Sequence, residues 1–128
     1  MKAIGVIPAR WGATRFEGKV LAELLGKPVI QHVWENAKKA KTLDDLIVAC
    51  DDERIIKVVE GFGGKAIYTS PKQPSGTDRL AEVVNPMDVK IAVNIQGDEP
   101  LVRPIMIDSL VIALEAEKVA QMATVIKR

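Results

Sequence analysis

Short apolar runs alternate with amphipathic stretches along most of the chain, and this alternation limits the possible folds more than any other feature. Several of the intervening stretches carry apolar residues at helical spacing, as in Ile30, Val33, Trp34 and Ala37. Strands that alternate with helices are typical of a parallel sheet with crossover helices. The sequence therefore predicts an α/β fold with a mainly parallel sheet and flanking helices. The expected strands are 2–8, 46–50, 65–69, 89–95 and 119–126.

The first expected strand, 2–8, is almost continuously apolar, which favours a central position with both faces covered. We expect Pro8 to end it, because proline cannot donate a hydrogen bond to a neighbouring strand. Helices are expected at about 28–40, 51–62, 77–84 and 104–117. The acidic residues 51–53 suit the positive end of the second helix, and the glycines at 61, 63 and 64 suit its termination.

Size and charge exclude several classes of protein. The chain has 128 residues, enough for one domain, and its formal net charge is only +1. Bulk electrostatics therefore predict neither a nucleic-acid partner nor an anionic membrane surface.

The longest apolar run, 110–114, is too short to cross a membrane, and the first residues lack a secretory apolar core, so we expect a cytoplasmic protein. The single cysteine, Cys50, is expected to be a buried apolar residue.

The segment 10–19 follows the first strand and has no apolar periodicity. It contains Arg10, Arg15 and Lys19 together with two glycines, a combination that suits a polyphosphate, because cations offset its charge and glycines allow the backbone to approach closely. The segment does not contain a Walker A motif. The alternative interpretation is a solvated basic loop.

Two further polar loops follow expected strands, and open α/β sheets bind their ligands at the carboxyl ends of strands. The segment 74–79 opens a helix, so its hydroxyl groups and amides either cap that helix or bind the polar edge of a ligand. The segment 96–100 contains Asp98 and Glu99, hard oxygen ligands that suit Mg²⁺ bridging to phosphates; a solvated turn is the alternative. His32 has no second histidine or cysteine as a metal partner, and we expect it to be structural.

Six motifs together resemble the 3-deoxy-manno-octulosonate (KDO) cytidylyltransferases, or CMP-KDO synthetases. The basic loop alone is similar to that of CMP-sialic acid synthetases as well, whereas its combination with SGTDRLAE and NxQGDEP is more specific to the KDO enzymes. The resemblance implies a Rossmann-like nucleotidyltransferase fold. The motifs are Ile7-Pro8-Ala9-Arg10, Thr14-Arg15-x-x-Gly18-Lys19, Gly26-Lys27-Pro28, Asp51-Asp52-Glu53-Arg54, 75–82 and 93–100.

The resemblance also implies roles for individual residues. Arg10, Arg15 and Lys19 would hold the phosphates of CTP, and Asp98 would bind Mg²⁺. Arg10, Lys19 and Asp98 would be the catalytic residues. The expected nucleotide-binding set is Ala9, Arg10, Arg15, Lys19, Ser75, Gly76, Arg79 and Gln96, of which Ser75, Arg79 and Gln96 would line the cytidine site. Members of the family transfer CMP from CTP to KDO, release pyrophosphate and serve lipopolysaccharide synthesis.

The chain departs from the family pattern in the basic loop, where Thr14 replaces a serine and Glu17 and Val20 replace prolines. Glu17 adds negative charge beside an expected anion site. Members of the family are also about twice as long, so 1–128 is expected to be the nucleotide-binding part, truncated at its C-terminal side and inactive without the sugar-binding half. The full-length protein is expected to be a homodimer. The alternatives are a cytidylyltransferase for another acidic sugar, 8-amino-KDO or sialic acid, and an inactive nucleotide-binding fragment.

Overall fold

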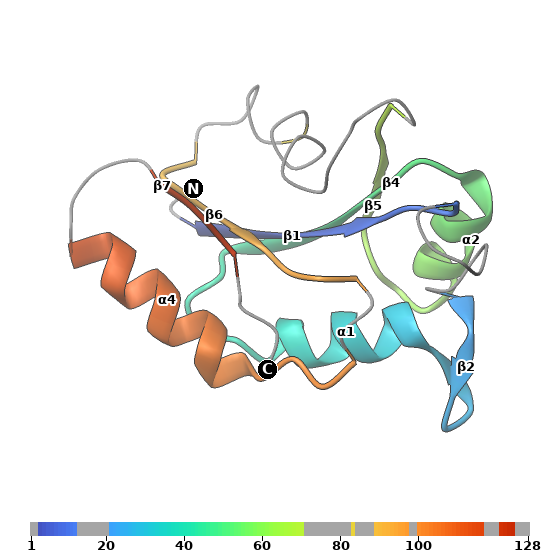
Figure 1. Ribbon diagram of the computed structural model, residues 1–128, viewed down its shortest axis with the longest axis horizontal. Helices are drawn as coiled ribbons and strands as arrows, with labels where there is room; N and C mark the ends of the chain where they lie inside the picture. The colour runs from blue at the N-terminus through green and yellow to red at the C-terminus, as the bar shows by residue number, and fades with distance from the viewer. Residues whose placement is uncertain are drawn as a thin grey trace.

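A five-stranded parallel sheet forms the centre of the protein in the computed structural model (Figure 1). The structure describes residues 3–12, 21–70, 83, 89–97, 100–116 and the backbone of 121–124. The expected α/β class with a parallel sheet is confirmed. In chain order the elements are β1 (Ala3–Ala9), β2 (Glu23–Leu24), β3 (Lys27–Pro28), α1 (Val29–Lys38), β4 (Asp45–Cys50), α2 (Glu53–Gly61), β5 (Ala66–Tyr68), β6 (Ile91–Asn94), α4 (Pro104–Ala116) and β7 (Gln121–Thr124).

The strand order in the sheet is β5-β4-β1-β6-β7, which places β1 at the centre as predicted. The chain moves outward from β1 through β4 to β5, and then continues on the other side of β1 with β6 and β7. The direction of winding therefore reverses between β1 and β6. Open α/β sheets bind ligands at such a switch point, beyond the carboxyl ends of the strands.

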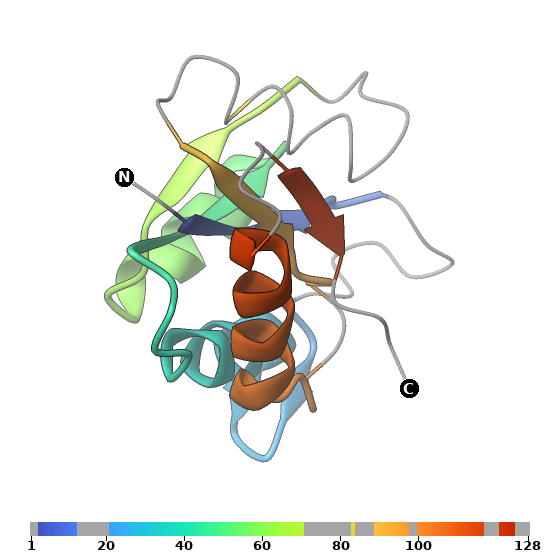
Figure 2. The ribbon, with the colours of Figure 1, turned by 90° about the vertical axis from the view of Figure 1, so that its left-hand side faces the viewer.

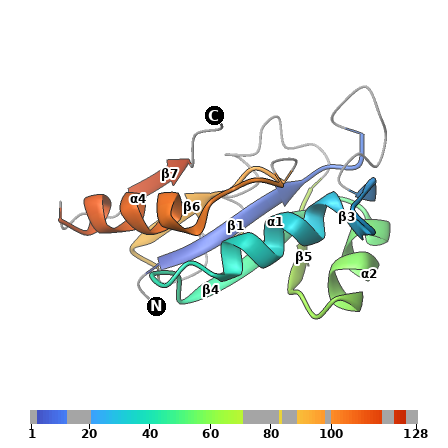
Figure 3. The same ribbon diagram turned by 90° about the horizontal axis from the view of Figure 1, so that it is seen from below.

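Helices α1, α2 and α4 cover one face of the sheet (Figures 1 and 3). Their buried side chains form one apolar cluster with those of β1, β4 and β6, and Figure 2 shows α1 and α4 on the same side of the strands. The other face carries a second cluster that includes Ile4, Val6, Ile47 and Val83. The expected burial of Cys50 is confirmed, and Trp34 of the apolar helical stripe is buried as well, with exposed fractions of 0% and 7%. Within the described residues, no helix has the length and apolar character needed to span a bilayer.

Pro8 does not end the first strand, contrary to the prediction. β1 continues to Ala9, and Pro8 lies opposite Ala49 of β4. The N–H of Ile95 donates to the carbonyl oxygen of Val6, so the polar groups of Val6, and those of Pro8 two residues later, face β6. The β6 ladder has already ended at that level, and the missing N–H of Pro8 therefore removes no strand hydrogen bond.

The second helix is shorter than expected, because only one of the three acidic residues lies within it. α2 begins at Glu53, and Asp52 caps it by accepting a hydrogen bond from the backbone N–H of Arg54. The expected glycine termination is confirmed: Gly63 and Gly64 donate backbone hydrogen bonds to Glu60 and Val59, and Gly63 adopts a φ of 87°.

A small hairpin, β2–β3, precedes α1 and was not predicted. Its turn contains Leu25 and Gly26, with φ angles of 53° and 82°. Pro28, where the expected helix 28–40 begins, belongs to β3 rather than to the first turn of the helix. His32 of α1 contacts the carbonyl oxygen of Leu24, which agrees with the structural role expected for this histidine.

Asp108 of α4 ties this helix to the connection between α1 and β4. Its carboxylate accepts hydrogen bonds from the backbone N–H groups of Lys41 (3.1 Å) and Thr42 (2.9 Å) and from the Thr42 hydroxyl (2.6 Å). Burial raises the pKa of the Asp108 carboxyl, but these hydrogen bonds outweigh burial and lower the pKa below its usual value.

Replacing Asp108 by alanine is expected to reduce the free energy of unfolding by about 1–3 kcal/mol at pH 7, because three donors lose their acceptor. A lowered folded-state pKa means that this stabilisation is present above the unfolded pKa, about 3.9, and disappears as the pH falls through the folded value. Urea unfolding of both proteins at a series of pH values measures the difference. A difference that persists unchanged at pH 2 would contradict the assignment.

Candidate functional site

The carboxyl ends of β1 and β6, where the candidate site is expected, lie side by side in the sheet. Val6 and Asn94 are opposite each other in the parallel ladder, and the N–H of Ile95 lies 2.9 Å from the carbonyl oxygen of Val6. Arg10 and Gln96 therefore each follow one of two neighbouring strands at the switch point of the sheet. The structure describes Ala9, Arg10 and Gln96 of the predicted set. The other predicted site residues lie outside the described part of the chain: Arg15, Lys19, Ser75, Gly76, Arg79 and Asp98.

Arg10 is half-buried at the end of β1. Its Nε atom is buried, and within the described structure it has no hydrogen-bond partner. A buried donor on a charged group that lacks an acceptor carries a free-energy cost of about 1–3 kcal/mol or more. An anion bound at this position would remove that cost. The side chain of neighbouring Ala9 packs in the core, so Ala9 can offer a ligand only its backbone.

Gly97 brings the segment after β6 directly against the backbone of β1. A Cβ atom on this residue would lie 2.6 Å from the carbonyl oxygen of Pro8, closer than real contacts allow. The glycine is therefore required for the close approach of two backbones. Asp98, the predicted metal ligand, follows Gly97 directly in the sequence.

Asn36 of α1 holds the other end of the same segment. Its side-chain Nδ2 donates to the carbonyl oxygen of Pro100 over 2.7 Å. Gly97 and Pro100, which flank residues 98 and 99, are therefore both held in place: Gly97 lies against β1 and Pro100 is hydrogen-bonded to α1. This contact leaves no signal in the sequence, because an asparagine beside the apolar stripe of a helix does not indicate a partner 64 positions away.

A second unpredicted contact group lies at the ends of β1 and β4. The backbone N–H of Trp11 donates to Asp51 (3.0 Å), and the Arg54 guanidinium lies 3.4 Å from the centre of the Trp11 ring. Arg54 also pairs with both carboxylate oxygens of Asp52. Its donors lower the pKa of the Asp52 carboxyl to about 2. The sequence had shown Trp11 to belong to the basic loop, but not what it packs against.

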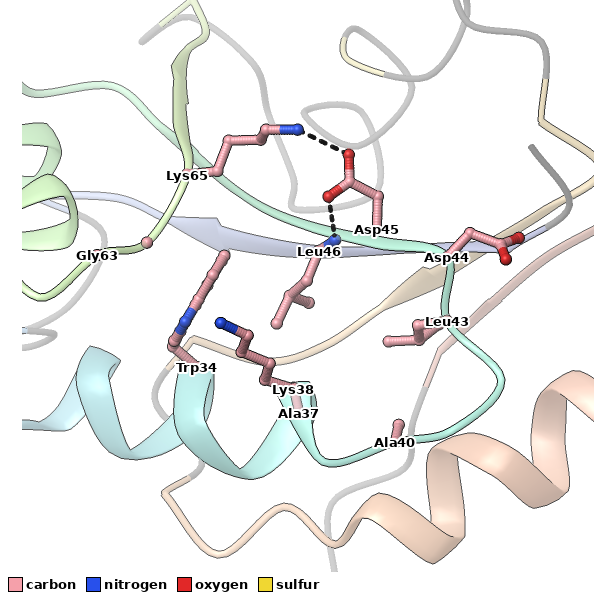
Figure 4. A pocket seen from close by; sticks show the side chains of 11 residues that line it. Trp34, Ala37, Lys38, Ala40, Leu43, Asp44, Asp45, Leu46, Gly63 and Lys65 are labelled. Carbon is pink, nitrogen blue, oxygen red and sulfur yellow. Dashed lines mark hydrogen bonds and ion pairs between the residues drawn. The ribbon is translucent and has the colours of Figure 1, made fainter.

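A cavity of about 360 Å³ lies at the opposite edge of the sheet (Figure 4). Trp34 and Lys38 of α1 line it together with Asp45 and Lys65, which form an ion pair at 2.8 Å. Asp45 begins β4 and Lys65 precedes β5, so the cavity lies at the amino ends of these strands. It is therefore separate from the candidate site.

Among the described residues, no group of three or more His, Cys, Asp or Glu side chains is arranged to hold a metal ion. Asp98 and Glu99 lie outside that set, so the predicted magnesium site stays a prediction.

The strand order and the close backbone crossing at the switch point of the sheet define a Rossmann-like α/β protein. A family model described as cytidylyltransferase matches residues 4–128. The chain belongs to the cytidylyltransferase family.

Among the curated relatives of the chain are several 3-deoxy-manno-octulosonate cytidylyltransferases. The chain is 49% identical over all its 128 residues to a 3-deoxy-manno-octulosonate cytidylyltransferase of Geobacter metallireducens. It is 54% identical, over 91% of its length, to the enzyme of the same name from Thermodesulfovibrio yellowstonii. The chain spans about half the length of these relatives, 50% and 49% respectively. The resemblance seen in the sequence motifs is confirmed.

Solved structures support the same fold. A CMP:2-keto-3-deoxy-manno-octonic acid synthetase complexed with CTP superposes with a TM-score of 0.89 and 44% identity, covering 92% of this chain and 49% of that one. A cytidylyltransferase from Leptospira borgpetersenii has a TM-score of 0.74 and 24% identity, covering 88% of this chain and 48% of that one; this second likeness concerns the fold alone. The expected Rossmann-like fold is confirmed.

Proposed function

We propose that the chain binds CTP at the carboxyl ends of β1 and β6, as the nucleotide-binding part of a 3-deoxy-manno-octulosonate cytidylyltransferase. The observation that carries the proposal is the buried Nε of Arg10, a donor without an acceptor at the switch point of the sheet. The names of the relatives and the CTP bound to the similar synthetase support the choice of nucleotide.

In this proposal Arg10, Arg15 and Lys19 hold the phosphates through charge-assisted hydrogen bonds. Gln96 follows β6 and carries an amide that can both donate to and accept from the edge of a base. Ala9 contributes its backbone. The roles of Ser75, Gly76 and Arg79 on the cytidine side stay predictions.

We propose that a magnesium ion accompanies the nucleotide at the end of β6. Gly97 lies against the Pro8 carbonyl oxygen, so the segment that continues with Asp98 and Glu99 in the sequence starts beside β1. Carboxylate oxygens are the ligands that Mg²⁺ prefers, and a bound ion would neutralise phosphate charge. We infer that Asp98 is the protein ligand.

We propose that the full-length enzyme transfers CMP to KDO without a covalent intermediate. The anomeric hydroxyl oxygen of the sugar forms a bond to the α-phosphorus of CTP and gives up its proton to water. The bond between the α-phosphorus and the oxygen that bridges to the β-phosphate breaks, and pyrophosphate leaves. The protein contributes positioning and charge neutralisation. We infer that the sugar site is formed by the part of the relatives that this chain does not span, and that these 128 residues alone do not turn over at a meaningful rate.

Several finer expectations stay predictions: a homodimer at full length, a cytoplasmic location and a place in lipopolysaccharide synthesis. The sugar also stays a prediction. An enzyme acting on 8-amino-KDO or sialic acid would use the same nucleotide site, so the described residues favour neither alternative.

Nucleotide choice tests the proposed function directly. CTP with Mg²⁺ is expected to raise the melting temperature of the chain more than ATP or GTP at equal concentration, because a ligand that binds only the folded state stabilises it. Differential scanning fluorimetry with all four nucleoside triphosphates measures this. Equal shifts would contradict the cytidine assignment and leave only a general phosphate site, and no shift at all would contradict the nucleotide site.

Replacing Asp98 by asparagine tests the metal ligand. The change preserves size but removes the charge that a hard cation needs, so Mg²⁺ should no longer strengthen CTP binding, while binding without Mg²⁺ stays similar. Isothermal titration calorimetry with and without Mg²⁺ distinguishes the two. Glu99→Gln is the matched control. If Glu99→Gln abolishes the Mg²⁺ effect on CTP binding and Asp98→Asn does not, the metal ligand is Glu99 rather than Asp98.

A further inference from the structure

We propose that Trp11 and Arg54 are positioning residues for the phosphate site. With Asp51 and Asp52 they form a group, here called the Trp11 clamp, that fixes the backbone directly after Arg10 and so presents the Arg10 guanidinium to the phosphates. The proposal rests on the proposed CTP site and adds to it a requirement for two residues outside the predicted site set.

The first contact of the clamp joins the ends of two neighbouring strands. The backbone N–H of Trp11 donates to the Asp51 carboxylate over 3.0 Å, although the two residues are 40 positions apart. Asp51 directly follows β4, and Arg10 directly follows β1. The residue after Arg10 is therefore hydrogen-bonded to the residue that directly follows the adjacent strand.

The second contact fixes the side chain of Trp11. The Arg54 guanidinium lies 3.4 Å from the centre of the indole ring, within the range of a cation–π interaction. Arg54 is itself oriented by Asp52: its Nε donates over 2.9 Å and one terminal nitrogen over 2.7 Å, one to each carboxylate oxygen. Because Asp52 also caps α2, the helix start sets the direction of the guanidinium.

This arrangement gives Arg54 a role different from that of Arg10. The Arg54 guanidinium is paired with a carboxylate and stacked on a ring, whereas the Nε of Arg10 is buried without an acceptor in the described structure. Arg10 is thus the arginine available to bind an anion, whereas Arg54 holds the Trp11 side chain in position. A binding group that is ordered before the ligand arrives loses less entropy on binding, so the clamp should strengthen phosphate binding in particular.

The test compares CTP with cytidine, which lacks the phosphates. In the 128-residue chain Trp11→Ala is expected to weaken CTP binding about 5- to 20-fold in calorimetry, with cytidine binding, followed by NMR titration, changed less than twofold. Trp11→Phe preserves an aromatic face and should stay within about threefold of the parent for CTP. Arg54→Gln should behave as Trp11→Ala does, and melting curves confirm that each variant is folded.

A double-mutant cycle shows whether the clamp acts through Arg10. In an Arg10→Ala background, Trp11→Ala should weaken CTP binding less than twofold. An equal loss in both backgrounds, or an equal loss for CTP and cytidine, would overturn the clamp while leaving the CTP site intact. A parent chain that binds no CTP would overturn the proposed function, and the clamp with it.

Discussion

Replacing Arg10 by alanine should weaken CTP binding by about 10- to 150-fold without destabilising the protein. A hydrogen bond to a charged group contributes about 1.5–3 kcal/mol, and each 1.4 kcal/mol changes a dissociation constant tenfold. In the folded state without ligand the Nε atom of Arg10 is buried without an acceptor in the described structure, so its removal breaks no hydrogen bond at this atom. The free energy of unfolding should therefore stay the same or increase slightly.

Calorimetry with CTP and urea unfolding without it measure the two quantities. Lys38→Ala is the matched control, since it removes the same charge from the cavity side of α1, at the opposite edge of the sheet. This variant should bind CTP as the parent does. An Arg10→Ala protein that loses stability but retains its CTP affinity would mean that the arginine is structural.

The second large effect is expected from Gly97→Ala. Its methyl group would lie 2.6 Å from the Pro8 carbonyl oxygen, a backbone atom that cannot move without displacing β1. Forcing extra volume into a packed contact usually costs about 1–3 kcal/mol of stability. Because Asp98 follows directly, we expect CTP binding in the presence of Mg²⁺ to fall more than tenfold as well.

Gly61→Ala is the control for this substitution. Gly61 is the last residue of α2, a Cβ there meets open space, and alanine in a helix is favoured over glycine by up to about 1 kcal/mol. Urea unfolding and calorimetry on both variants decide the question. If Gly97→Ala is as stable as the parent and binds CTP equally well, the close crossing of the two segments does not shape the site.

The sequence predicts the five strands of the sheet and the helices α1, α2 and α4 because their apolar patterns are set locally, whereas the expected helix 77–84 lies almost entirely outside the described residues. The prediction that Pro8 ends the first strand is wrong. A missing backbone N–H costs a hydrogen bond only where a neighbouring strand lies opposite it, and the pairing of β6 with β1 ends before Pro8. The prediction that the second helix includes Asp51 is also wrong, because α2 begins at Glu53. Three successive acidic residues suit a helix start, but only the folded chain shows that Asp51 accepts from Trp11 instead.

The candidate site is predicted only in part for a related reason. Strand ends can be located from composition, so Arg10 and Gln96 are found in the sequence and the sheet order brings them together. Contacts between segments far apart in sequence leave no local pattern. Asn36 with Pro100 and Arg54 with Trp11 belong to this kind, and each supports a loop that the motifs had identified.

The central claim is that CTP binds at the switch point between β1 and β6. A titration of the ¹⁵N-labelled chain with CTP and Mg²⁺, followed by two-dimensional NMR, locates the ligand without assuming its site. We expect the largest shifts at the backbone amides of Arg10, Trp11, Gln96 and Gly97, with those of the cavity at the opposite edge, such as Lys38, unchanged. Shifts confined to that cavity, or no shifts at saturating CTP, would contradict the account.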